Sequence, residues 1–325
     1  MKKSTIMIGA VAAAVAVGYP AYKSFFGATA VEVSEKALNT KFSEYRNSES
    51  FISAQELNAL MSSDQDVVVI GALNPMRPNQ PISGSFTLWR NDYSASSDAY
   101  PFGGMQNTQE EMEALLSQFG ATPESTIVVY AADSHHDAAR LFWQVTALGH
   151  NDVRYLDGGL NAWMGADFAT GNANPSVEAT EYAAPSYSDI ELATLDMVID
   201  AQTNDDWVII DTRSLAEFDG STTVSGAAGP GAIPGSVHIE WTETVEADST
   251  LREKQELAAL YADVIEGKKV ITYCQSGVRS AHSLLVLKEI LGAQEVYNYD
   301  GSWIEYSHEH YVEKNPSVNV MNGNS

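Results

Sequence analysis

Residues 270–302 read VITYCQSGVRSAHSLLVLKEILGAQEVYNYDGS, and a related pattern occurs earlier in the chain. Residues 127–159 read IVVYAADSHHDAARLFWQVTALGHNDVRYLDGG, and a fixed offset of 143 positions aligns the two stretches without a gap. Identical residues then face each other at the pairs Tyr130/Tyr273, Leu148/Leu291, Gly149/Gly292, Val153/Val296, Asp157/Asp300 and Gly158/Gly301. Self-similarity over this length indicates an internal repeat.

The repeat extends toward the N-terminal side of both stretches. Residues 66–73 (DVVVIGAL) match residues 206–213 (DWVIIDTR), and residues 81–86 (PISGSF) match residues 232–237 (AIPGSV). We therefore interpret the chain of 325 residues as two copies of one folding unit, which agrees with the two domains favoured by its length.

Each copy alternates short apolar runs with amphipathic segments. The runs rich in Val and Ile are 67–70, 127–130, 207–210 and 270–273, and the amphipathic segments are 109–119, 138–148, 253–265 and 280–291. This alternation is typical of a parallel sheet covered by helices, so each copy is predicted to be an α/β domain. Capping boxes, Ser53 with Glu56 and Ser188 with Glu191, predict that a helix begins at each of these serines.

The remaining segments complete the domain plan. We expect an N-terminal extension over 31–50, a first domain over 51–170 and a second domain over 188–312. Residues 171–187 carry two prolines without periodicity and are interpreted as a linker. Residues 313–325 are polar and are predicted to be a flexible tail.

Residues 1–30 differ from the rest of the chain. Lys2 and Lys3 precede an apolar run over 6–18, and residues 28–30 offer a small-x-small site, which is typical of an export signal. Two outcomes remain open, namely a cleaved signal peptide or a retained anchor in the inner membrane. In either case the body of the protein is predicted to be periplasmic or otherwise exported.

The charge of the chain argues against a nucleic acid partner. Lys and Arg total 18 against 43 Asp and Glu, the formal net charge is -25, and the basic residues form no cluster that could follow a phosphate backbone.

The only cysteine of the chain, Cys274, follows the apolar run 270–273. A loop that joins a strand to a helix lies at the carboxyl edge of a parallel sheet, where α/β folds collect ligands. Backbone N–H groups of the loop QSGVR (275–279) and the charge of Arg279 favour an anion on the sulfur, and Gly277 relieves the steric cost of a tight loop. The pattern predicts a reactive thiolate, whereas composition alone is equally compatible with an inert buried thiol.

The first copy lacks this thiol, because Ala131 stands at the position of Cys274. We therefore expect one active site, which lies in the second domain and faces the cleft between the domains.

Several motifs together resemble one known family. The loop YCQSGVRS (273–280) resembles the active-site loop of the rhodanese superfamily, and DTRSLAEFDG (211–220), AIPGSVHI (232–239) and DGSW (300–303) stand in the order that the family shows. The first copy resembles the family's non-catalytic partner domain, with DGGLNAW (157–163) as its clearest mark. The resemblance covers roughly residues 50–312 and implies an α/β fold of two tandem rhodanese-like domains, each a parallel sheet flanked by helices.

The resemblance also implies a sulfurtransferase that needs neither a cofactor nor a metal. In such enzymes a cysteine takes sulfur from thiosulfate or a similar donor, holds it as a persulfide and passes it to a thiol or to cyanide. Cys274 is then the nucleophile, and Ser280 and Asp211 support the loop. The donor is bound by residues of the loop and by one upstream arginine: Gln275, Ser276, Gly277, Val278, Arg279 and Arg213. For Arg213, an ion pair with Asp211 or Glu217 is an equally good interpretation.

Three alternatives remain open. Phosphatases of a related fold use a Cys-x5-Arg loop, and the Cys-x4-Arg spacing from Cys274 to Arg279 disfavours them. A 3-mercaptopyruvate sulfurtransferase is disfavoured because residues 222–231 supply no arginine for a substrate carboxylate. A non-enzymatic partner-binding or redox-sensing protein is the alternative from another class. The neutral residues Gln275 and Ser276 also leave a protein thiol or a small persulfide open as the sulfur partner.

Other residues that could suggest chemistry have simpler interpretations. His135 and His136, which occupy the positions of the catalytic loop in the first copy, are expected to be solvated and not to bind a metal. His282 is expected to face either the core or the pocket, and Trp163 and Trp303 are expected to lie in the core or between the domains.

Overall fold

The computed structural model describes residues 35–96, 98–132 and 135–323. The export signal or anchor predicted for residues 1–30 lies outside them. Within these ranges, no helix combines the length and the apolar character that crossing a membrane requires.

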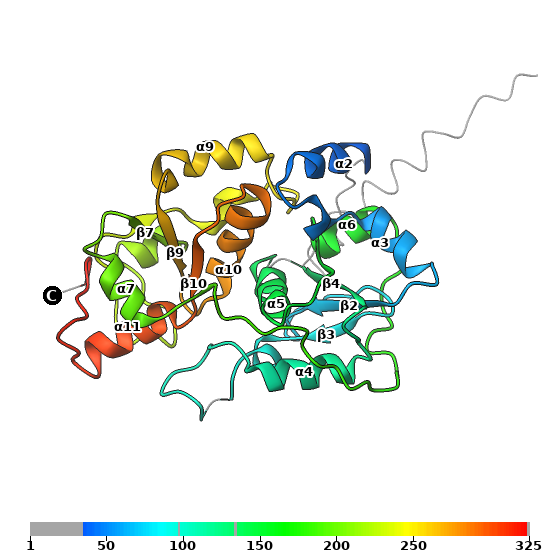
Figure 1. Cartoon of the computed structure of the whole chain (residues 1–325), viewed down its shortest axis with the longest axis horizontal. Coiled ribbons are helices and arrows are strands. Elements are labelled where there is room, and N and C mark those ends of the chain that lie inside the picture. Colours follow the sequence, from blue (N-terminus) through cyan, green and yellow to red (C-terminus); the bar gives the residue numbers. More distant parts are fainter. Residues whose placement is uncertain (1–34, 97, 133–134, 324–325) are drawn as a thin grey trace, which may run out of the picture.

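The predicted α/β fold of two domains is confirmed, since the chain forms two five-stranded sheets in which every strand pair is parallel (Figure 1). The first sheet has the order β1-β5-β4-β2-β3, with β1 Phe51–Ile52, β5 Val153–Leu156, β4 Thr126–Ala131, β2 Val67–Ala72 and β3 Phe86–Leu88. The second has the order β6-β10-β9-β7-β8, with β6 Leu192–Ala193, β10 Val296–Tyr299, β9 Lys269–Tyr273, β7 Trp207–Asp211 and β8 Val237–His238. The two orders are the same.

Helices cover these sheets. The first domain has α3 Ala54–Met61, η2 Arg90–Tyr93, α4 Gln109–Gln118, α5 His135–Ala147 and α6 Gly159–Gly165. The second domain has α7 Leu195–Ala201, α8 Leu215–Phe218, η3 Trp241–Thr244, α9 Lys254–Ile265, α10 Val278–Leu285, which continues as the π-helical η4 Val286–Ile290, and α11 Ser302–Tyr311. Strands β2 and β4 are almost entirely buried, as expected for parallel strands with helices on both faces.

The repeat is visible in side-chain contacts as well as in topology. The hydroxyl of Tyr130 accepts the backbone N–H of Ile82 and lies 2.8 Å from the hydroxyl of Ser85. In the second domain, the hydroxyl of Tyr273 accepts the N–H of Ile233 in the same way. Each tyrosine thus fixes the turn that precedes the edge strand of its own sheet.

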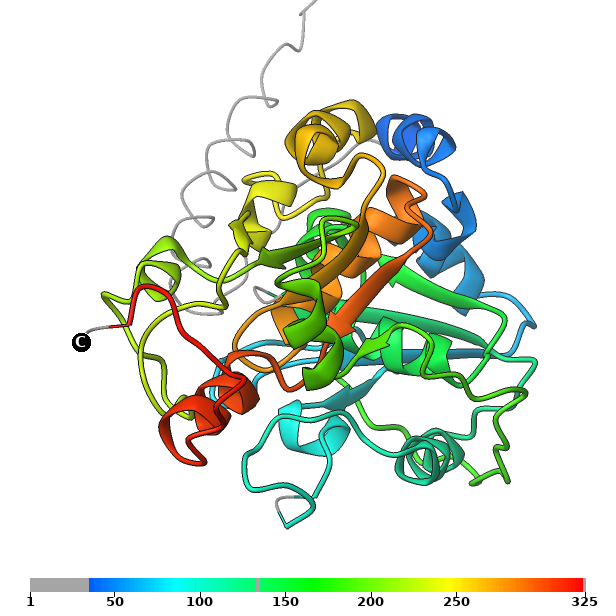
Figure 2. The same ribbon diagram turned by 60° about the vertical axis from the view of Figure 1, so that its left-hand side comes forward.

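The two domains share one apolar interface. Helices α5 and α10 pack against each other between the sheets (Figure 2). One buried apolar cluster includes residues of both helices, among them Ala139, Phe142, Ala281 and Leu285. Because an apolar interface resists relative motion of domains, we expect the two domains to move as one body.

Helix α2 (Glu35–Glu44) and the residues after it bind both domains. The ammonium group of Lys41 forms a buried ion pair with Asp157 of the first domain and donates to the carbonyl of Leu251 in the second. Asn47 donates to the carboxylate of Glu289 at 2.8 Å. The segment is therefore a strap across the domain junction.

The segment predicted to be a linker, residues 171–187, contains neither helix nor strand. It runs along the first domain, where Tyr182 contacts His150 and the N–H of Ala184 donates to Glu113.

Two expectations differ from the structure. The helix predicted to begin at Ser188 begins at Leu195 instead, because Thr194 caps it and follows strand β6 just as Ser53 follows β1. The flexible tail expected over 313–325 is instead packed for residues 313–323: Val318 is buried, and Met321 pairs with Ala232. The polar composition of this segment concealed its few apolar anchors.

The junction also buries three histidines, and this generates a prediction about pH. His135, His136 and His282 are buried. Burial is the main cause that lowers the pKa of His135 and His136 to about 4 and the pKa of His282 to about 3. The unfolded chain takes up these protons near pH 6.5, whereas the folded chain does not until lower pH. The free energy of unfolding should therefore fall between pH 6.5 and pH 4, by up to about 1.4 kcal/mol per pH unit for each histidine.

Urea unfolding midpoints at pH 7.5 and pH 5.5 would measure this effect. His282→Gln should show a shallower pH slope than the parent, and His310→Gln, whose partners Val318 and Tyr311 lie in the second domain, should keep the parental slope. Equal midpoints of the parent at both pH values would contradict the prediction.

Candidate active site

Cys274 directly follows the central strand β9 and precedes α10. Its side chain is 1% exposed, and it forms no disulfide. Proteins with open parallel sheets bind ligands at the carboxyl ends of the strands, and the sulfur lies at that edge of the second sheet.

The loop surrounds the sulfur with hydrogen-bond donors. The backbone N–H groups of Ser276 and Ser280 donate to Sγ, and the hydroxyl oxygen of Ser280 lies 3.6 Å from it. Burial raises the pKa of the Cys274 thiol, but the charge of Arg279 and these hydrogen bonds outweigh burial, so the pKa lies below its ordinary value. The surroundings favour a thiolate.

The amide of Gly277, expected to face the donor, is already used within the protein. It donates to the hydroxyl oxygen of Ser302 at 2.9 Å, and the N–H of Cys274 donates to the same oxygen at 3.1 Å. Gly277 has φ +72°, a conformation that side chains rarely adopt. The glycine therefore shapes the loop, while its N–H anchors it.

The hydroxyl of Ser280 is used within the protein. Its hydroxyl donates to the side-chain oxygen of Asn298 at 2.6 Å, and the amide nitrogen of Asn298 donates to the carbonyl of Gly277 at 3.0 Å. Asn298 thus connects the start of α10 to the middle of the loop.

Arg279 is paired inside the protein. Its guanidinium donates two hydrogen bonds to the carboxylate of Glu217, at 2.7 and 2.8 Å. Burial alone would raise the pKa of Glu217. The hydrogen bond and charge of Arg279 outweigh burial and lower this pKa to about 2. The positive charge beside Cys274 is therefore partly neutralised before any donor arrives.

Arg213 forms the ion pair that was one of its two interpretations. It is 1% exposed, contacts the carboxylate of Asp211 at 2.6 Å and lies over the rings of Tyr273 and Trp303. Its guanidinium also donates to the carbonyl of Gly231. These contacts support a structural role for Arg213 rather than the donor-binding one.

The other loop residues differ in their surroundings. Gln275 is buried and donates to the carbonyls of Val224 and Ser225, so it holds the neighbouring segment. Val278 is buried, and Ser276 is half-buried. A Cβ placed on Gly104 of the first domain would lie 2.8 Å from the Cβ of Ser276. The loop therefore faces the first domain, as predicted.

The histidines of the first copy are not solvated, contrary to expectation. His135 and His136 are 3% and 9% exposed, and Trp241 of the second domain packs edge-on against His136 with ring centroids 4.5 Å apart. His282 of the second domain is buried at the same junction, with its ring centroid 5.3 Å from that of Trp241 in its own domain and 6.5 Å from that of Tyr155 in the first. The contact with Trp241 of the second domain contributes to the burial of His136.

The sequence did not single out Ser302 or Asn298 as site residues, although the repeat places Ser302 opposite a glycine, Gly159. Ser302 has φ +49°, and its repeat partner Gly159 has φ +50°. A serine in a backbone conformation that suits glycine needs a reason, and here the hydroxyl holds two loop amides. Asn298 carries no such signal, because its partner Tyr155 differs in size and chemistry.

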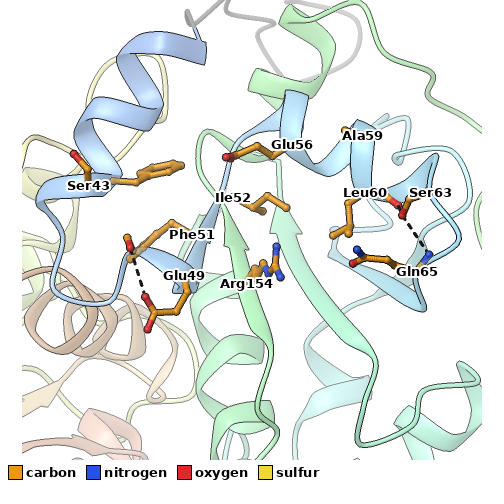
Figure 3. Close-up of a pocket in the computed structure, with 12 residues that line it drawn as sticks. Ser43, Glu49, Phe51, Ile52, Glu56, Ala59, Leu60, Ser63, Gln65 and Arg154 are labelled. Carbon is orange, nitrogen blue, oxygen red and sulfur yellow. Dashed lines mark hydrogen bonds between the residues drawn. The ribbon is translucent and has the colours of Figure 1, made fainter.

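A cavity of about 720 Å³ lies between the strap, at Phe42, Ser43, Ser48 and Glu49, and the first domain, and it is separate from this site. Figure 3 shows the apolar side chains of Phe51, Ile52 and Leu60 among those that line it, together with the charged side chains of Glu56 and Arg154. No residue of the Cys274 loop lines it.

Comparison with known proteins places this geometry in a family. The model of the Rhodanese-like domain matches residues 53–166 and 194–309. A Corynebacterium glutamicum protein named "Thiosulfate sulfurtransferase" is 34% identical over 205 residues, which are 61% of this chain and 68% of that protein. A Haloferax volcanii protein named "Putative thiosulfate sulfurtransferase" is 36% identical over 207 residues, 61% of this chain and 72% of its own length.

Solved structures share the fold. The anaerobic ergothioneine biosynthesis enzyme from Chlorobium limicola has a TM-score of 0.71 at 24% identity, covering 86% of this chain and 72% of that one. The Tum1 protein from Saccharomyces cerevisiae has a TM-score of 0.70 at 19% identity, covering 84% and 98%. With two matched domains that span most of the chain, the protein belongs to the rhodanese family.

Proposed function

We propose that the protein is a sulfurtransferase that carries sulfane sulfur as a persulfide on Cys274. The observation that carries the proposal is the surroundings of the buried thiol, where the charge of Arg279 and the backbone N–H groups of Ser280 and Ser276 lower its pKa. The relatives named as thiosulfate sulfurtransferases support the same reaction class.

The reaction balances with thiosulfate as donor. The Cys274 thiolate attacks the outer sulfur of thiosulfate and forms a new S–S bond, while the S–S bond of the donor breaks and sulfite leaves with the electron pair. An acceptor thiolate or cyanide then attacks the outer sulfur of the persulfide. The bond between that sulfur and Sγ breaks, and the Cys274 thiolate is restored.

The protein contributes an anion-stabilising environment and not a general base. A thiolate that forms at neutral pH needs no proton acceptor at the moment of attack. The N–H groups that stabilise the thiolate remain near the persulfide, which is also anionic when deprotonated. The same donors therefore serve both halves of the reaction.

The loop offers little unpaired positive charge to an anionic donor. Gln275 and Ser276 are neutral, and the charge of Arg279 is shared with Glu217. We propose thiosulfate or another small sulfane-sulfur compound as donor, and a low-molecular or protein thiol as acceptor. For 3-mercaptopyruvate, residues 222–231 supply no arginine to hold the carboxylate, and Arg140 and Arg213 are buried in ion pairs within the protein.

The first prediction concerns the persulfide itself. After incubation with thiosulfate and removal of excess donor, the intact mass of the parent should rise by one sulfur atom, and cyanide should reverse the gain. Cys274→Ser should gain nothing. If the parent carries a free thiol and still gains no sulfur, thiosulfate is not the donor and a non-enzymatic role becomes the better interpretation.

A second prediction concerns Glu217. In Glu217→Gln the charge of Arg279 is no longer shared, so thiosulfate should bind better and its KM should fall by a few-fold to about tenfold. Steady-state kinetics with cyanide as acceptor measures this effect. Glu246→Gln, which removes the partner of Arg252 at an exposed site, is the matched control and should keep the parental KM. An unchanged KM in Glu217→Gln would show that Arg279 does not contact the donor.

A further inference from the structure

Arg140, in helix α5 of the first domain, reaches into the active-site loop of the second. Its side chain is 0% exposed. One guanidinium nitrogen, Nη1, donates to the carbonyl of Gly277 at 3.2 Å and forms an ion pair with the carboxylate of Asp300. The other, Nη2, donates to the carbonyl of Gly104 at 3.1 Å. One side chain thus joins two domains at the loop that carries Cys274.

The loop is shaped to admit this guanidinium. A Cβ on Gly277 would lie 2.6 Å from Nη1 of Arg140, closer than real Cβ atoms approach, and it would also collide with the carboxylate of Asp300. Glycine is therefore required here by the close approach of Arg140 as well as by its positive φ.

Asp300 connects the ion pair to the rest of the site. Its second oxygen accepts the backbone N–H of Gln106 of the first domain at 2.7 Å. Two positions further along the chain, the hydroxyl of Ser302 accepts the amides of Cys274 and Gly277. Arg140 thus acts on the loop directly at Gly277 and indirectly through Asp300.

The repeat shows that this contact is specific to the junction. In the first domain, Asp157 is the partner of Asp300, and it receives Lys41 of the strap and the N–H of Leu251. At the repeat position of Arg140, the second domain has the small residue Ser283. The repeat alone therefore does not account for the Arg140–Asp300 pair.

We infer that Arg140 is a positioning residue contributed by the first domain, which holds the Cys274 loop in its reactive shape and balances the charge of Asp300 beneath it. The inference rests on the proposed function only in taking Cys274 as the reacting atom. It assigns the first domain a part in the active site, although that domain has no thiol of its own.

The inference predicts opposite directions for the pKa shift of Cys274 when Arg140 or Asp300 loses its charge. Removing Arg140 leaves the buried carboxylate of Asp300 uncompensated, which disfavours a second negative charge on Cys274. Removing the charge of Asp300 leaves Arg140 uncompensated, which favours the thiolate. General loosening of the junction would instead shift both variants in the same direction.

The experiment measures the rate at which iodoacetamide alkylates Cys274 between pH 5 and pH 10, on the full chain, together with the melting temperature. In Arg140→Gln the thiol pKa should rise by on the order of one unit, with about tenfold slower alkylation at neutral pH. In Asp300→Asn it should fall. Arg140→Lys, which retains the charge but not the planar fork, should shift it less than Arg140→Gln does.

Arg154→Gln is the matched control, because Arg154 pairs with Asp152 within the first domain and away from the loop. It should keep the parental pH profile. Lower melting temperatures with parental profiles in Arg140→Gln and Asp300→Asn would overturn the inference and leave Arg140 as a stabiliser of the junction. If Arg140→Gln does not fold, Arg140→Lys and Asp300→Asn decide, and parental profiles or shifts of the same sign in both overturn it.

Alkylation does not depend on a sulfur donor, so this test is separate from that of the proposed function. If the parent takes up no sulfur from thiosulfate but the pKa of Cys274 shifts in opposite directions in Arg140→Gln and Asp300→Asn, thiosulfate is rejected as the donor and the inference about Arg140 stands. If the parent takes up sulfur but the two pKa shifts are not opposite, the proposed function stands and the inference about Arg140 is rejected.

Discussion

A negative charge on Cys274 has to be stabilised almost without water, since the side chain is 1% exposed. Burial alone disfavours a thiolate, so the protein has to supply donors and positive charge at fixed positions. The loop after β9 does this with amides that converge on the sulfur, with Ser280 and with the nearby charge of Arg279. The parallel sheet fixes where the loop starts, and α10 fixes where it ends. Much of the surrounding structure keeps this short segment in one conformation.

The two copies of the repeat have kept the same framework for different purposes. Tyr130 and Tyr273 fix corresponding turns, and the two sheets have the same strand order. The differences gather at the loop, where Cys274 and Arg279 stand opposite Ala131 and His136. In the first copy the corresponding segment carries His136, which is buried against Trp241 of the second domain. Its helix α5 became part of the wall of the other domain's site.

Local patterns in the sequence predicted the strands, the principal helices and the position of the thiol, because burial between helices leaves continuous apolar runs. The ion pair of Arg213 with Asp211 was also among the interpretations, since both belong to one short motif. The predicted start of α7 at Ser188 was wrong. Ser188 is followed three residues later by Glu191, as in a capping box, whereas the actual cap, Thr194, is followed by Met197. The burial of His135 and His136 and the contact of Arg140 with Asp300 could not be predicted, because they depend on residues far apart in sequence that meet only when the domains dock. The roles assigned to the loop residues in binding a donor stay predictions.

The strap made by α2 and the residues after it has a consequence for the timing of entropy loss. The domains are held by an apolar interface and by the strap, which contacts Asp157, Leu251 and Glu289. An enzyme whose domains close around each substrate must order its site again in every cycle. Here we expect the site to be preorganised. The chain loses the conformational entropy of the site once, when it folds, and not at each binding event.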